Sequence, residues 1–229
     1  MKKAFNLSLL FLFMLCLKIQ AQDCSIYFPF KKGIKAEMSN FDKKDKLITT
    51  AKYEVTNNES IAGGTLITFS NETYDAKGKL MAKSDLSAKC INGDYYTDIK
   101  TISSEMIPRS SDISVSVTGD QMVYPASMKV GDALKDASIN VKTSMGSMTI
   151  MNMTATIVNR KVEGNETIET PAGKFDCLKI TYALNMKLMG SRTMQGVEYL
   201  AKGVGVVKQE TYDDKGVKQS TLLLTKLEK

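Results

Sequence analysis

Apolar and polar residues alternate with a period of two along most of the chain. Over residues 47–56, Tyr53 and Val55 share one parity, while Lys52 and Glu54 fall on the other. Because successive side chains of a β-strand point to opposite faces of its sheet, this alternation predicts a half-buried strand. The same alternation recurs in three later segments, residues 80–90, 151–157 and 178–188. No segment keeps a 3.6-residue apolar stripe, so little helix is expected.

Turn signals separate the predicted strands. Asn92-Gly93 is the strongest, because a type I′ hairpin needs a positive φ at both central residues and this pair tolerates it best. A short motif begins at Phe41, Tyr74 and Tyr212, in each case an aromatic residue, an Asp and a lysine-containing turn. The Asp side chain can cap such a turn. We interpret this motif as repeated hairpin chemistry rather than as a binding motif.

The chain after the first 21 residues is predicted to be a single domain. Residues 22–229 show no shift in composition and no Pro-rich or Ser-rich linker. We expect about 10–12 antiparallel strands in them. With so few helices to cover it, a sheet of this length must curl on itself. The predicted fold class is therefore all-β, a curled antiparallel sheet that forms an incomplete barrel or a sandwich.

Residues 1–21 have the character of a secretory signal peptide. Two lysines precede a mostly apolar stretch, residues 4–17, which is short for a membrane-spanning helix, and Ala21 allows cleavage before Gln22. An uncleaved N-terminal anchor is the alternative. No later run approaches 18 apolar residues, so no membrane span is expected after cleavage. We predict a periplasmic protein, with secretion or surface exposure as alternatives.

Composition excludes several kinds of chemistry. The chain has 229 residues and no His, which removes Ser-His-Asp and Cys-His catalysis and HExxH zinc sites. No GxSxG, SxxK or Walker-type motif occurs, so we expect no enzyme, no cofactor and no metal site. Loss of residues 1–21, with three lysines and no acid, lowers the net charge from +6 to +3. The basic residues are scattered, so no nucleic-acid partner is expected.

Three cysteines remain after cleavage, Cys24, Cys90 and Cys177. Lipoprotein processing needs a small residue before the lipidated cysteine, but Asp23 precedes Cys24. One disulfide and one free thiol is the simplest arrangement in an exported protein. Cys90 points with the apolar row before a hairpin turn, and Cys24 lies on an arm that needs tethering, so we predict a Cys24–Cys90 disulfide. Cys177 has the opposite parity to Leu178 and is expected among polar neighbours.

Six short motifs follow one another in a distinctive order along the mature chain. They are residues 27–33 (YFPFKKG), 74–79 (YDAKGK), 90–93 (CING), Tyr124-Pro125 with Val130-Gly131, 170–177 (TPAGKFDC) and 201–208 (AKGVGVVK). In this order they resemble the TapB-like exported proteins of Gram-negative bacteria. The resemblance implies a periplasmic, almost all-β domain similar to the incomplete barrels of lipoprotein carriers. It implies no catalytic residue. Two departures are Asp45, where Gly is usual, and Tyr199-Leu200, where a Trp-Tyr pair is expected.

Methionine is unusually frequent, with 14 residues in the chain. Seven lie in two clusters, Met145, Met148, Met151 and Met153, and then Met186, Met189 and Met194. A copper(I) site would have to be built from thioethers alone, since neither His nor a cysteine pair is near. Filling irregular gaps in the core is the plain interpretation. The other is an adaptable apolar cavity on a concave sheet face.

The apolar rows of two segments are predicted to face one concave side and to bind a ligand. Their residues are Met151, Met153, Ile157, Leu178, Ile180, Tyr182, Leu184 and Met186. We therefore expect an exported, non-enzymatic binding or carrier module for an apolar, lipid-like envelope ligand. The alternative is a structural or assembly protein of the cell envelope that acts through an envelope protein partner.

Overall fold

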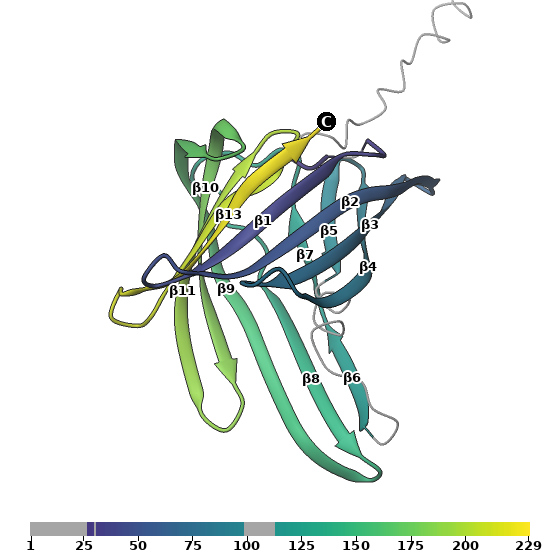
Figure 1. Cartoon of the computed structure of the whole chain (residues 1–229), viewed down its shortest axis with the longest axis vertical. Helices are drawn as coiled ribbons and strands as arrows, with labels where there is room; N and C mark the ends of the chain where they lie inside the picture. The colour runs from purple at the N-terminus through teal and green to yellow at the C-terminus, as the bar shows by residue number, and fades with distance from the viewer. Residues whose placement is uncertain (1–26, 30, 99–112) are drawn as a thin grey trace, which may run out of the picture.

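A computed structural model describes residues 27–29, 31–98 and 113–229, and within them the chain forms β-strands and no helix (Figure 1). The thirteen strands are β1 (Lys35–Asp42), β2 (Leu47–Ile61), β3 (Gly64–Asp75), β4 (Leu80–Ile91), β5 (Asp94–Asp98), β6 (Ile113–Gly119), β7 (Gln121–Tyr124), β8 (Ala137–Met145), β9 (Met148–Thr170), β10 (Gly173–Lys187), β11 (Ser191–Ala201), β12 (Gly205–Tyr212) and β13 (Lys218–Glu228). The predicted all-β class is confirmed, with slightly more strands than expected. The predicted signal peptide lies outside the described residues.

All thirteen strands belong to one antiparallel sheet that curls into a nearly closed barrel (Figure 1). The order is β6-β8-β9-β10-β11-β12-β13-β1-β2-β3-β4-β5-β7, so most neighbours are also consecutive in the chain. β6 and β7 lie at the two ends of this order and are not paired with each other, which leaves one unsealed seam. Antiparallel neighbours with short connections explain why alternation alone indicated the architecture.

One bent segment of chain bridges the seam, because β6 pairs with β8 and the following β7 pairs with β5. The bend lies at Gly119 and Asp120. Gly119 has φ +153°, and a Cβ atom there would lie 2.3 Å from the carbonyl oxygen of Ser138. The backbone N–H of Asp120 donates to that oxygen at 2.8 Å. The Ser138 backbone N–H and hydroxyl both donate to the Asp120 carboxylate, at 3.0 and 2.9 Å, and so hold the bend to β8.

The repeated turn motif has the predicted chemistry in all three copies. Asp42, Asp75 and Asp213 each accept two backbone N–H bonds, from residues two and four positions later, at 2.8 to 3.0 Å. The left-handed position is taken by Asp45, with φ 56°, in the first copy, and by Gly in the others. The Asn92-Gly93 turn also has positive φ at both residues, 52° and 87°. These predictions are confirmed.

The core consists of two clusters. The first joins strands from both halves of the sheet, including Val55, Ile67 and Ile180, with the loop residue Leu134. The second contains Cys177, Tyr199 and Ala201, with one further buried residue from each of β1, β9, β12 and β13. On β11, Leu200 belongs to the first cluster while both of its neighbours belong to the second. Since neighbouring side chains point to opposite faces, β11 is buried on both faces.

Cys177 corrects one expectation. It is a free cysteine, as predicted, but it is buried among apolar residues rather than polar ones. Burial raises the pKa of its thiol to about 11, with a smaller contribution from Asp176. The parity argument failed because it assumed one buried face, whereas the sheet is covered on both faces here. Cys90 is fully buried in the first cluster. Cys24 lies outside the described residues, so the Cys24–Cys90 disulfide stays a prediction.

Candidate functional site

The structure brings the predicted ligand-binding rows to one face of the sheet. β9 and β10 are hydrogen-bonded neighbours, with Ile157 opposite Leu184 and Ala155 opposite Met186. The register of β10 against β11 is unbroken, so every second residue of β10 shares that face. The shared face comprises the eight predicted residues, Met151, Met153, Ile157, Leu178, Ile180, Tyr182, Leu184 and Met186. We call it the methionine face.

The upper part of the methionine face is filled core. Ile180 is fully buried, Leu178 packs against the first cluster, and Tyr182 is 6% exposed. The Tyr182 ring lies over Gly196 on β11, where a Cβ atom would come within 2.1 Å of the ring. The Tyr182 hydroxyl accepts a hydrogen bond from the Gln209 side chain. These contacts leave no room for a ligand beside Ile180 or Tyr182.

The lower part of the methionine face lies on two hairpins that project from the barrel, β8–β9 and β10–β11 (Figure 1). β9 and β10 pair only as far as Thr154 and Lys187, and beyond that point the hairpins separate. Met151, Met153, Ile157, Leu184 and Met186 are half-buried here. None of these five belongs to either core cluster of the described residues. The sequence alone did not divide the row into a filled part and an open part.

A buried polar cluster lies beside the filled part of the face. Arg160 on β9 and Glu198 on β11 are 1% and 3% exposed. The Arg160 Nη1 donates to the carbonyl oxygens of Val123 at 3.0 Å and Lys135 at 2.9 Å. The Tyr124 hydroxyl donates to Glu198 Oε2 at 3.2 Å. Arg160 therefore ties β7, on one side of the seam, to β9, which lies on the other side.

The charges of this cluster are incompletely compensated. Arg160 Nη2 and Glu198 Oε1 are 4.0 Å apart, and neither has a hydrogen-bond partner among the described residues. Burial raises the pKa of Glu198 to about 7, although Arg160 and Tyr124 act in the opposite direction. Burial, and secondarily the Glu198 charge, raises the pKa of Tyr124.

Sequence reasoning missed this cluster because Arg160 and Glu198 were counted only as scattered charges. A charged residue within the otherwise apolar run at residues 197–201 was the available signal. Since the cluster is closed to solvent and the hydrogen bonds of Arg160 go to backbone carbonyls on both sides of the seam, we assign it a structural role in closing the barrel.

Two cavities are described, and both have charged linings. The first, about 290 Å³, is lined by Lys35, Lys52, Glu72 and neighbouring residues of β1 to β4 and β13. The second, about 500 Å³, lies between the start of β11 and the β12–β13 turn. Neither contains a residue of the methionine face. In the described part of the chain, no three His, Cys, Asp or Glu side chains meet to hold a metal ion. That part also contains no helix long and apolar enough to cross a bilayer.

Comparisons with known proteins support the fold and identify the family. A "putative exported protein with YmcC-like fold" from Bacteroides fragilis has a TM-score of 0.74 and 24% identity, and the match covers 90% of this chain and 100% of that one. A "putative lipoprotein" from Parabacteroides distasonis has a TM-score of 0.75 and 26% identity, with the same coverage. No curated protein matches the chain in sequence.

The family model described as DUF3108-like matches residues 31–224. This range includes β1 to β12 in full and β13 as far as Leu224. This name, rather than TapB-like, is the one that the comparisons support. The chain belongs to the DUF3108-like family.

Proposed function

We propose that this protein is an exported, non-catalytic module that binds an apolar, lipid-like ligand on the open part of the methionine face. The observation that carries the proposal is the half-burial of Met151, Met153, Ile157, Leu184 and Met186 outside both core clusters of the described residues. Unbranched thioether side chains adapt to ligands of variable shape. An acyl chain on this face would gain about 0.8 kcal/mol for each methylene it buries.

The proposed site is an open face rather than an enclosed pocket, since neither described cavity includes it. A ligand would therefore lie along the hairpins between Leu184 and Met153, with its remaining surface exposed or covered by a partner. Such a geometry suits transient loading and release better than long-term storage. The periplasmic location and the TapB-like relationship are parts of the same proposal, and the location is supported by similar proteins that are described as exported or as lipoproteins.

Titration with 11-(dansylamino)undecanoic acid tests this function. Met153→Asp and Met186→Asp each place a carboxylate on the open face and are expected to weaken binding at least tenfold, because a charge there must be desolvated against the acyl chain. Met81→Asp is the matched control, because Met81 is 63% exposed and lies on β4, which is part of neither hairpin. Circular dichroism would verify that each variant is folded. Equal binding by all three variants would contradict the proposal, as would no binding by the unmodified protein.

The alternative, an assembly protein, is favoured by one observation on β6. This strand pairs only with β8 among the described strands, and its sequence ISVSVTG carries no charge. Uncharged edge strands are suited to accept a strand from another protein. Native mass spectrometry after mild extraction separates the two functions. The carrier should retain a small apolar adduct, whereas the assembly protein should retain a polypeptide.

A further inference from the structure

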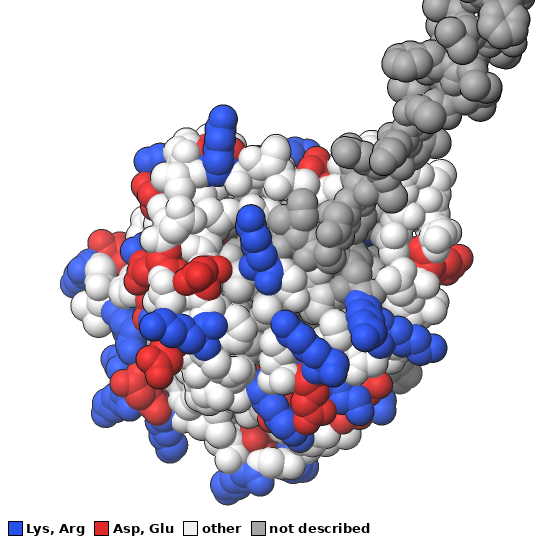
Figure 2. Space-filling view, turned by 90° about the horizontal axis from the view of Figure 1, so that it is seen from above, with Lys and Arg blue, Asp and Glu red and all other residues white. Residues whose placement is uncertain are grey.

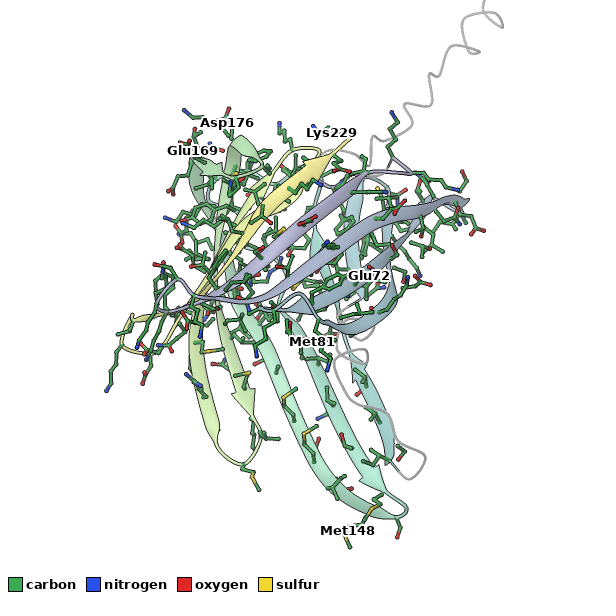
Figure 3. All side chains as sticks on the ribbon, viewed as in Figure 1. Glu72, Met81, Met148, Glu169, Asp176 and Lys229 are labelled. Atoms are coloured by element: carbon green, nitrogen blue, oxygen red, sulfur yellow. The ribbon has the colours of Figure 1, made fainter. Side chains whose placement is uncertain are left out.

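The tips of the two projecting hairpins expose large apolar side chains in the same direction. Five of the ten most exposed large hydrophobic residues lie there, Met145 (51%), Met148 (64%), Ile150 (50%), Leu188 (50%) and Met189 (102%). We call these five residues the hairpin tips. Met148 is at the far end of the β8–β9 hairpin, opposite Glu169 and Asp176 at the other end of the molecule (Figure 3). The β10–β11 tip points the same way (Figure 1).

The projecting parts of the two hairpins, residues 137–157 and 184–196, contain basic residues and no acidic ones. None of the 25 acidic residues of the chain falls in residues 137–157 or 184–196, whereas Lys142, Lys187 and Arg192 do. All three basic residues are exposed, a few positions from a tip. The opposite end differs, because lysines and carboxylates are intermixed on the surface seen from above (Figure 2). Exposed apolar tips with a basic collar therefore occur only at one end of the described structure.

We propose that the hairpin tips insert into the surface of a lipid bilayer that contains anionic headgroups. The apolar tips would enter the boundary between headgroups and acyl chains, while Lys142, Lys187 and Arg192 remain at headgroup level and pair with phosphates. The projecting ranges, residues 137–157 and 184–196, carry no acidic residue of their own that such a surface would repel. This inference goes beyond ligand binding and stands without it, since the tips are separate from the methionine face.

Vesicle co-sedimentation of the mature protein tests the proposal. Vesicles of phosphatidylcholine with 30% phosphatidylglycerol should retain the protein at low salt, and pure phosphatidylcholine should retain it at least tenfold less. The double variant M148S/M189S should lose at least tenfold in partitioning, because it removes the two most exposed apolar side chains. Undiminished partitioning of this variant would overturn the proposal, as would equal retention by both vesicle types or none by either.

A matched charge control distinguishes a local effect from net charge. The triple variant K142Q/K187Q/R192Q removes three charges at the tips and should reduce partitioning by about fivefold for each residue. The triple variant K89Q/K174Q/K202Q removes three exposed charges near the β4–β5, β9–β10 and β11–β12 turns, outside the projecting ranges, and should partition nearly as the unmodified protein does. Equal losses in both triple variants would show that only net charge matters and would overturn the assignment to the tips.

The chain contains no Trp, which permits a direct measurement of depth. Met189→Trp places a single fluorophore at a tip, and Met81→Trp places one on β4 as a control. The emission of the first should shift to the blue with anionic vesicles and be quenched by brominated lipid, whereas the second should not change. An unshifted Met189→Trp emission would contradict insertion, and so would a blue shift without vesicles that grows with protein concentration, which indicates self-association. Dansyl-fatty-acid binding by M148S/M189S should persist, so failure of either proposal can be recognised separately.

Discussion

The barrel body and the projecting hairpins are formed partly by the same strands, yet their side chains are covered very differently. On β10, Ile180 is fully buried in the first core cluster, whereas Leu188, just beyond the strand, is half exposed at a tip. The body encloses even charged groups, Arg160 and Glu198. The projecting parts of the hairpins, residues 137–157 and 184–196, have no acidic residue and leave apolar side chains exposed at their ends. Alternation therefore defines the faces of a strand, and its position relative to the barrel decides whether a face is core or surface.

Arg160→Ala should have the largest effect, because it removes the side chain that joins β7 to β9 across the seam. It would leave Glu198 buried without its counter-charge and two backbone carbonyls without a donor. We expect a loss of about 3–5 kcal/mol in the free energy of unfolding, measured by urea denaturation. Arg192→Ala, on an exposed hairpin position, is the control and should change stability by less than about 0.5 kcal/mol. Similar values for the two would contradict the contrast between body and hairpins.

Loss of the predicted Cys24–Cys90 disulfide should destabilise the body by about 3–5 kcal/mol, because the bond would close a long loop. The adjoining arm already packs there, since Phe28 stacks on Tyr95 with ring centroids 3.5 Å apart. Peptide mapping without reductant checks the pairing, and denaturation of Cys90→Ser measures the effect. Recovery of Cys177 in a bridged peptide would show that the assignment is wrong.

Substitutions along β10 compare the two regions directly. Ile180→Ala should cost about 2–5 kcal/mol, because it opens a cavity in the first core cluster. Leu188→Ala should cost less than about 0.5 kcal/mol, since the side chain is half exposed at a tip. Thermal and urea denaturation of both variants would measure the difference. A large loss for Leu188→Ala would mean that the tip packs against the body in solution.

The pH dependence of stability should report on the buried carboxyl of Glu198. Its pKa is about 7 in the folded state, above the usual value of 4.5, so the folded protein binds this proton more tightly than the unfolded chain. Stability from this group is complete below about pH 4.5 and is lost as pH rises through 7, by up to about 3 kcal/mol. Glu198→Gln should flatten that part of the pH profile. A profile unchanged by the substitution would contradict the raised pKa.

Local features were predictable from sequence because a few neighbouring residues determine them. Asp42, Asp75 and Asp213 cap their turns with backbone N–H groups only two and four residues away. Asn92-Gly93 adopts the positive φ values that its residue types favour. Period-two alternation likewise depends only on strand geometry. Together these established the all-β class, the strand segments and the shared face of β9 and β10 residues.

The tertiary structure decided what covers each face, because that depends on residues far apart in the chain. Cys177 is buried because β10 is covered on the face that alternation marked as polar. Arg160 is buried because β7 and residue Lys135 provide carbonyl acceptors from distant segments. The methionine face is core at Ile180 and open at Met153 because the barrel ends between them and the hairpins continue. Strand periodicity carries no information on where a curled sheet closes, since closure depends on pairing between segments distant in sequence.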